Sequence, residues 1–246
     1  MTSVSILNFQ TFFHTYLDET DHFIFMTGLL LEWVKALGFP RLIFIFTLVV
    51  VLILSGPNLE IPHSDSLDYL VLNTIRSSMP DYFGPPLVFI YQLSGAQFTG
   101  ILVISLLFYF ILRRFWADFI CLFLGTAGIL GIIDRILKPW FARPRPDNSS
   151  LLLSGASFPS GHAAGSMVFY FMSCTLLATH YPRLRLPLFV FSSLWVSLVW
   201  LSTLYCRAHW PSDIVAGASV GFVWLSICLA GLRVWERHKS LPSIKR

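Results

Sequence analysis

The chain alternates between long apolar runs and short segments that carry most of its polar residues. A helix that crosses a bilayer needs about 17 to 25 mostly apolar residues. Six runs approach or meet this length once helix tilt is allowed for. They cover residues 41–56, 97–113, 116–137, 163–180, 187–206 and 212–233. The pattern therefore predicts an all-α membrane protein built as a six-transmembrane helix bundle.

Two further segments lack the pattern of a simple transmembrane span. Residues 22–37 are mostly apolar at first and then mix charged with apolar side chains. We interpret them as a helix lying in the membrane interface, with a seventh span as the alternative. Residues 57–95 contain acidic residues and several prolines, which predicts a long loop with a surface helix over residues 65–78.

Basic residues predict the orientation of the helices, because short cytoplasmic loops are enriched in Lys and Arg. Most of them precede the first run or follow the second, fourth and sixth runs, which places them on one side of the bundle. They are Lys35, Arg41, Arg113, Arg114, Arg183, Arg185, Arg233, Arg237, Lys239, Lys245 and Arg246. We expect that side to be the cytoplasmic side of a cell membrane, plasma or inner, with both termini on it.

Composition favours a membrane protein over a soluble one. Hydrophobic residues make up 55% of the 246 positions and charged residues 12%, about half the usual share in soluble domains. The net charge is +4, but the basic residues lie between apolar runs and not on one soluble face. We therefore expect no nucleic-acid binding and a secondary attraction to anionic lipid.

No linker divides the chain, so its organisation is expected to be simple. We expect an N-terminal interfacial segment over residues 1–40, one catalytic domain over 41–233 and a basic cytoplasmic tail over 234–246. The four cysteines lie in or at the ends of apolar runs and lack the spacing of zinc ligands. We interpret them as packing residues.

Basic residues also occur on the opposite, outer face, where topology alone does not call for them. One segment there reads Lys-Pro-Trp-Phe-Ala-Arg-Pro-Arg-Pro from Lys138 to Pro146. Guanidinium groups bind phosphate oxygens in pairs, and Lys adds a compact charge. The prolines are expected to forbid a regular helix, so that Lys138 and Arg145 turn toward one point. A basic loop that only contacts lipid headgroups is the alternative for this segment alone.

A second segment, Pro159-Ser160-Gly161-His162, directly precedes the fourth run on the same outer face. The N-terminus of a helix carries partial positive charge and free backbone N–H groups, which suit an anion. The alternative, which this tetrapeptide alone favours, is that Ser160 caps the helix and Gly161 permits the turn.

The third segment, Arg207-Ala-His-Trp-Pro-Ser-Asp213, precedes the sixth run. His209 lies four residues before Asp213. A carboxylate at this spacing can hold one ring nitrogen in a fixed tautomer and leave the other free to attack phosphorus. The three outer segments together therefore contain the residue types that a phosphate-transfer site needs.

These segments resemble the signature of the type-2 phosphatidic acid phosphatase (PAP2) superfamily. Its Lys-x6-Arg-Pro element has counterparts in Lys138, Arg145 and Pro146. Its Pro-Ser-Gly-His element is similar to residues 159–162. The resemblance covers about a third of the chain, and the six-helix plan extends it to nearly all.

The third element of the family, Ser-Arg-x5-His-x3-Asp, matches at Ser202, His209 and Asp213. Thr203 stands where the family has an arginine that contacts phosphate. Arg207 follows four residues later, about 6 Å along the same helix face if the helix continues that far. We hypothesise that Arg207 takes the place of the missing arginine.

The resemblance implies that His209 is the nucleophile, that Asp213 orients it and that His162 is the general acid. A phosphohistidine would form and then be hydrolysed by water. Arg143 would either assist or face lipid headgroups. The implied phosphate-binding residues are Lys138, Arg145, Arg207, Ser160 and Gly161, with Arg143 and Thr203 as auxiliary positions.

We expect no cofactor and no metal ion, because Asp134, Asp147 and Asp213 are scattered among cations and do not form a cluster. The expected partners are the bilayer and a lipid phosphate or pyrophosphate, whose headgroup reaches the site while its chains stay in the membrane. The sequence does not select among phosphatidic acid, phosphatidylglycerophosphate, polyprenyl pyrophosphate and lipid A phosphates, nor does it indicate the oligomeric state.

Two alternative functions fit the same residues. A phosphotransferase would pass the phosphate from the phosphohistidine to a hydroxyl group in place of water. A catalytically silent protein would keep the fold and bind anionic lipid, and Thr203 is the one feature that favours it. A transporter is disfavoured, because the middles of the apolar runs lack charged residues.

Overall fold

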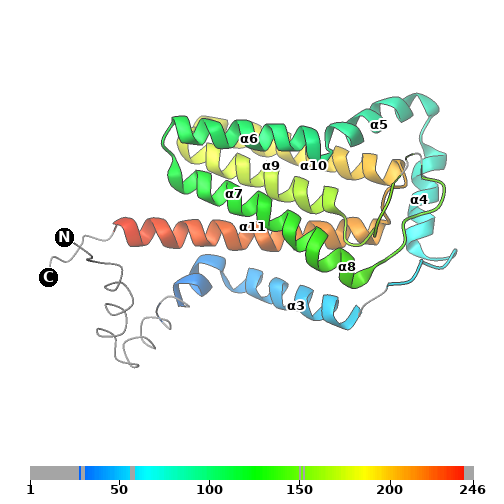
Figure 1. Ribbon diagram of the computed structural model, residues 1–246, viewed down its shortest axis with the longest axis horizontal. Helices are drawn as coiled ribbons and strands as arrows, with labels where there is room; N and C mark the ends of the chain where they lie inside the picture. The colour runs from blue at the N-terminus through cyan, green and yellow to red at the C-terminus, as the bar shows by residue number, and fades with distance from the viewer. Residues whose placement is uncertain (1–27, 29–30, 56–58, 150, 152, 241–246) are drawn as a thin grey trace, which may run out of the picture.

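The computed structural model describes residues 28, 31–55, 59–149, 151 and 153–240, and every regular element in these ranges is helical. The prediction of an all-α membrane protein is confirmed. Most helices run side by side, while α4 crosses one end of the bundle (Figure 1). The helices are α3 (Phe39–Ser55), α4 (Leu67–Ser78), α5 (Gly84–Leu93), α6 (Ala96–Leu112), α7 (Trp116–Gly131), α8 (Lys138–Phe141), α9 (Gly161–His180), α10 (Arg185–Tyr205) and α11 (Pro211–Ser240).

The six predicted runs coincide with helices whose ends lie within a few residues of the predicted ends, apart from α11, which extends to Ser240, into the predicted tail. By length and composition, three of the described helices are able to cross a membrane: Trp116–Phe141, Pro182–Tyr205 and Pro211–Lys239. The number rises to five if each of two bent helix pairs forms one span. The count of six spans therefore stays a prediction.

The N-terminal interfacial helix predicted over residues 22–37 lies largely outside the described residues. Its last part, Leu31–Leu37, is helical and makes an angle of 93° with Phe39–Leu54. Gly38 lies between them with a φ of +78°, a left-handed conformation that glycine adopts without steric cost. The bend agrees with the prediction that this part of the chain is not one continuous transmembrane span.

The predicted loop over residues 57–95 is in fact mostly helical. The surface helix that we expected is α4, and the side chain of Ser66 caps it by accepting a hydrogen bond from Tyr69 N–H (3.4 Å). A 3₁₀ turn, Asp81–Phe83, then leads into α5, so the expectation of a loop is wrong there. The segment Asp81–Leu93 meets α6 at an angle of 51°, and proline and glycine near its start had made it look irregular.

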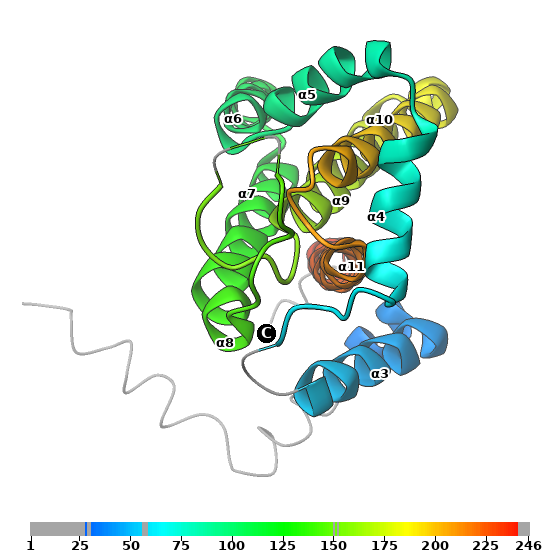
Figure 2. The ribbon, with the colours of Figure 1, turned by 90° about the vertical axis from the view of Figure 1, so that its right-hand side faces the viewer.

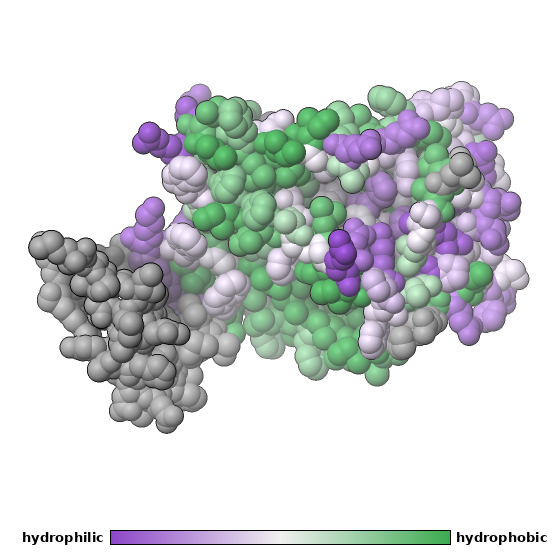
Figure 3. Space-filling view, in the orientation of Figure 1, coloured by the Kyte–Doolittle hydropathy of each residue, from purple (hydrophilic) through white to green (hydrophobic). Residues whose placement is uncertain are grey.

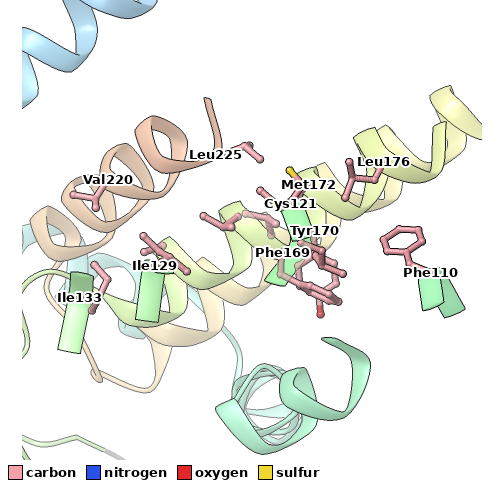
Figure 4. Close-up of a cluster of buried hydrophobic side chains, with 14 residues drawn as sticks. Phe110, Cys121, Ile129, Ile133, Phe169, Tyr170, Met172, Leu176, Val220 and Leu225 are labelled. Atoms are coloured by element: carbon pink, nitrogen blue, oxygen red, sulfur yellow. The ribbon is translucent and has the colours of Figure 1, made fainter. Parts of the chain in front are cut away.

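Helix α9 packs between α7, α10 and α11 and contributes more residues to the main buried core, drawn in Figure 4, than any other helix. Small residues let the helices approach closely. A Cβ at Gly128 of α7 would come within 2.4 Å of the Trp224 ring, and one at Gly125 within 2.4 Å of Met172. The Trp224 indole donates to the Gly125 carbonyl (3.0 Å) and joins α11 to α7.

The outer surface of the bundle is strongly apolar. Large side chains such as Phe46, Ile104 and Leu194 are more than 60% exposed. Figure 3 shows apolar side chains along the helices and hydrophilic ones gathered mainly at the end that carries α4. A surface of this kind fits a surrounding of lipid tails.

Candidate active site

The three segments that the sequence singled out meet at the end of the bundle that carries α4 (Figure 2). They are α8 with the start of the loop that follows it, the N-terminus of α9 and the link between α10 and α11. Ser160 N–H donates to the carbonyl of Asp213 (3.0 Å), and the Trp210 indole donates to the carbonyl of Pro144 (3.0 Å). The structure therefore brings the segments together, as their order along the helices had indicated.

The first segment is more helical than its prolines suggested. Helix α7 continues through a π-helical stretch, Ile132–Leu137, into α8, and only at Ala142, with a φ of +43°, does the chain leave the helix. The ring of Pro139 would clash with the carbonyl four residues earlier in a regular α-helix, and a wider π turn relieves that clash. The expectation that no helix forms here is thus corrected for residues 138–141.

His209 lies in the link between α10 and α11 and is only 2% exposed. Its Nδ1 is 3.4 Å from Oδ2 of Asp213, at ion-pair distance but without hydrogen-bond geometry. Its Nε2 is 3.4 Å from Nη1 of Arg145. Catalytic hydrogen bonds are often long until substrate binds. One ring nitrogen therefore faces a carboxylate and the other faces a cation.

Asp213 is fully buried, and both of its oxygens accept hydrogen bonds. Oδ1 accepts from Nη1 of Arg143 (2.6 Å), and Oδ2 accepts from the backbone N–H of Trp210 (2.9 Å). Arg143 is itself buried, and its Nη2 pairs with Asp68 (2.9 Å). Its guanidinium is held between two carboxylates inside the protein, so the expectation that Arg143 faces headgroups is corrected, while an assisting role for it stays a prediction.

Asp68 of α4 is a site residue that the sequence analysis did not single out. Its Oδ1 accepts from Ser212 N–H (2.9 Å), and its Oδ2 accepts from the Ser212 hydroxyl (2.6 Å) and from Arg143 (2.9 Å). Ser212 in turn accepts from Nη1 of Arg143 (2.7 Å). These contacts fix the first turn of α11, in which Asp213 lies. The position of Asp68 at the start of a surface helix gave no sign of this role.

Lys138 lies beside the N-terminus of α9. A Cβ placed on Gly161 would be 3.7 Å from the ammonium nitrogen of Lys138. The ammonium group also donates to Oδ1 of Asp134 (2.7 Å), a half-exposed carboxylate one helical turn earlier. A partly exposed pair of this kind is weak, so it leaves Lys138 available to an anion.

Arg145 is positioned by neutral groups. Its Nη1 donates to the carbonyl of Ala208 (2.7 Å), and its Nε and Nη2 donate to the carbonyls of Gly155 (3.2 Å) and Ala156 (3.4 Å). Carbonyls orient the guanidinium without cancelling its charge. Arg145 therefore keeps a full positive charge next to Nε2 of His209.

His162 occupies the first turn of α9, with its ring centroid 6.4 Å from that of His209. Its Nε2 is buried and has no hydrogen-bond partner among the described residues. The ring stacks on Tyr91 of α5, with centroids 4.6 Å and planes 27° apart. Tyr91 was missed from the sequence, because it lies in the segment that we had interpreted as a loop.

Two other predicted positions stabilise the helices. The Ser160 hydroxyl accepts from Ala163 N–H (3.3 Å), which is the helix-cap alternative. The backbone N–H of Ser160 is taken by Asp213, so the free N–H groups at this end are those of Gly161 and the residue after it. Thr203 is fully buried, and its hydroxyl donates to a carbonyl one turn earlier in α10 (2.7 Å).

Arg207 does not lie on the helix face that we had assumed. Helix α10 ends at Tyr205, and Arg207 has a left-handed φ of +54°. Its guanidinium donates to the side-chain amide of Asn73 in α4 and to the carbonyl of Asp147 (3.5 Å). The premise of its predicted role is therefore wrong, and Arg207 instead ties the link between α10 and α11 to α4.

The charges around the site favour a neutral His209. Burial lowers the pKa of His209 below its ordinary value. The nearby carboxylate of Asp213 opposes this shift, and the charges of Arg145 and Lys138 lower the pKa further. A neutral ring keeps the lone pair that a nucleophile needs.

In the part of the chain that the structure describes, no group of three or more His, Cys, Asp or Glu side chains is arranged to hold a metal ion.

Residues 119–237, which contain all three segments, match the family model of the PAP2 superfamily. Over this range the resemblance to the PAP2 superfamily is confirmed. Its fold is similar to that of a transmembrane PAP2-type phosphatidylglycerolphosphate phosphatase from Bacillus subtilis, with a TM-score of 0.65 and 19% identity. The alignment covers 83% of this chain and 98% of that one. No curated protein sequence gave a significant match.

Proposed function

We propose that the protein is a membrane phosphatase that removes phosphate from a lipid phosphomonoester or pyrophosphate through a phosphohistidine. The observation that carries the proposal is the setting of His209, with Nδ1 facing buried Asp213 and Nε2 facing Arg145, each at 3.4 Å. The match to the PAP2 superfamily supports it, as does the fold shared with a phosphatase of a lipid phosphate.

In the first step, the lone pair on Nε2 of His209 attacks phosphorus. An N–P bond forms while the bond from phosphorus to the lipid oxygen breaks. Asp213 holds the proton on Nδ1 and stabilises the positive charge that develops on the ring. His162, across the site, gives a proton to the departing lipid oxygen.

In the second step, water attacks the phosphohistidine and passes a proton to His162 as the N–P bond breaks. His209 returns to its neutral state and inorganic phosphate leaves. Charge on the phosphoryl oxygens is stabilised in both steps by Lys138 and Arg145, with the N-terminus of α9 adding backbone N–H groups. The centroid separation of 6.4 Å between the two imidazoles suits a phosphoryl group held between them.

We further infer that the site faces the outer side of the cell membrane. In the described chain, basic residues follow α6, lie at the start of α10 and occur at the end of α11. This end of the bundle is opposite to α4 (Figure 1). Basic residues are enriched on the cytoplasmic side, so they favour the cytoplasm for that end. A lipid phosphate can then reach His209 with its headgroup while its acyl chains stay among the apolar helix surfaces. Metal independence stays a prediction from the sequence.

The proposal is tested by measuring phosphate release from a panel of lipid phosphates and pyrophosphates by the purified full-length protein. We expect at least one lipid to be turned over, at a rate that excess EDTA leaves unchanged. Release from none of the panel would contradict the proposed function, and loss of turnover in EDTA would contradict its metal independence. An added alcohol acceptor that gains the phosphate would identify a phosphotransferase instead.

Asp68 offers a test of how the site is positioned. Replacing Asp68 with Asn leaves Arg143 with one carboxylate partner and weakens a charge-assisted hydrogen bond, so we expect kcat to fall about 10-fold with little change in KM. Asp65→Asn, at an exposed position three residues earlier, is the control and should retain parental kcat. A parental kcat in Asp68→Asn, with unchanged thermal stability, would show that Asp68 does not position the nucleophile.

A further inference from the structure

A large groove lies on the side of the bundle away from His209. It has a volume of about 1310 Å³ and is formed by α9, α10 and α11 together with the start of α3 and the residues before it. Its lining along α9 begins at Met167 and reaches Thr179, 17 residues beyond His162. None of its lining residues belongs to the site described above, so the groove is a separate feature.

The walls of the groove offer few free hydrogen-bonding groups to a ligand. Aromatic and aliphatic side chains supply much of them: Met167, Phe171, Leu186, Phe189, Phe222, Leu225 and Leu229. Three hydroxyl residues also line it, but each donates to a carbonyl of its own helix: Thr175 (2.7 Å), Thr179 (2.6 Å) and Ser226 (2.8 Å). With these donors already engaged, the walls suit hydrocarbon better than a polar ligand.

One end of the groove is strongly basic. Arg41, Arg183, Arg185 and Arg233 line it, and no acidic side chain is among the lining residues. All four arginines are exposed. Arg41 gives one hydrogen bond to the carbonyl of Leu37 (2.9 Å), and Arg233 gives one to the carbonyl of Ala36 (3.4 Å). Each guanidinium has five N–H groups, so most donors stay available.

We propose that this groove binds one anionic glycerophospholipid from the leaflet opposite to the one that His209 faces. The phosphate lies among the four arginines, and the acyl chains follow the apolar walls along α9. Basic pockets between transmembrane helices on the cytoplasmic side are suited to anionic headgroups. The positive charge at the basic end of the groove favours an anionic lipid over a second copy of the chain. A second copy would place its own four arginines next to these four and be repelled.

The lipid would act as a structural partner, since the groove joins elements that are far apart in sequence. Helix α3 touches the rest of the described bundle mainly through α11, whereas Arg183 lies in the turn between α9 and α10. A bound lipid would bridge these parts through its phosphate. It follows that the protein should be more stable with the lipid than without it.

The test uses the full-length protein, purified in detergent and stripped of lipid. We expect phosphatidylglycerol to give a one-to-one complex in native mass spectrometry and to raise the midpoint of thermal unfolding, and phosphatidylcholine to do neither. Inorganic phosphate alone should also have no effect, because it lacks the chains that the walls bind. Equal binding of the two lipids would overturn the proposal, as would a dimer that forms through this face.

Two variants locate the binding site. Arg183→Gln combined with Arg185→Gln should raise Kd for phosphatidylglycerol about 30-fold, at roughly fivefold for each basic residue. Arg113→Gln combined with Arg114→Gln removes the same charge from another loop of the same end and should leave Kd unchanged. Equal effects of the two pairs would mean that surface charge, and not the groove, binds the lipid.

A third variant keeps every arginine and fills the apolar wall. Ala178→Trp places a large ring in the groove, and we expect it to remove the one-to-one lipid complex. If the complex persists in Ala178→Trp with parental Kd, the acyl chains do not occupy the groove. None of these variants touches a residue that we assign to the phosphatase site, so phosphate release serves as a separate check that each variant is folded.

Discussion

Replacing His209 with Ala is expected to lower kcat for phosphate release by about four orders of magnitude or more, because covalent catalysis is lost with the nucleophile. The phosphohistidine should disappear as well. Brief incubation of the parent with a ³²P-labelled lipid phosphate, followed by an alkaline quench, should leave acid-labile label on the protein, and His209→Ala should carry none.

His63→Ala is the matched control for that experiment, since His63 is exposed on the approach to α4 and no interaction of its side chain is seen in the structure. It should keep both parental turnover and the label. Because His209 is buried, thermal unfolding of His209→Ala must be measured to show that the variant is folded. Turnover within tenfold of the parent in a folded His209→Ala would rule out this nucleophile.

Replacing Arg145 with Ala is expected to reduce kcat/KM about 10²- to 10³-fold, the usual effect of removing one group that stabilises transition-state charge. Its guanidinium is oriented by three carbonyls and lies 3.4 Å from Nε2 of His209, the nitrogen that we propose attacks phosphorus. The reduction should appear in kcat as well as in KM, because charge on the phosphoryl oxygens changes during the reaction. Steady-state kinetics on the best lipid of the panel measure both.

Arg207→Ala is the informative comparison with Arg145→Ala. The sequence had favoured Arg207 as the replacement for the arginine missing at Thr203, but the structure directs it toward Asn73 and Asp147. We therefore expect Arg207→Ala to keep kcat/KM within a few fold of the parent. A loss as large as that of Arg145→Ala would restore the first hypothesis and would mean that the link between α10 and α11 moves when substrate binds.

The helices and the meeting of the three segments could be predicted because both depend on local signals. Apolar runs of sufficient length mark helices whatever their neighbours are. Because successive spans cross the membrane in opposite directions, Lys138, His162 and His209 then fall at one end of the bundle. The pairing of His209 with Asp213 also followed from spacing in the chain. These inferences needed no knowledge of which helix packs against which.

The parts that the sequence did not predict depend on contacts across long stretches of chain. Asp68 lies 75 residues before Arg143 and 144 residues before Ser212, and its role exists only once α4 lies across the end of the bundle. Tyr91 likewise becomes a site residue by stacking on His162. Arg207 was misplaced by a local cause, because helix α10 ends two residues before it.

The placement of α4 also bears on the order in which the site can form during synthesis. Asp68 emerges from the ribosome long before Ser212, and Arg143 emerges between them, so neither half of the network has all its partners until the last helix is in place. A nascent chain that stops before α11 would therefore hold Arg143 without the carboxylate of Asp213. We expect competence for phosphate transfer to arise only after the whole bundle has inserted.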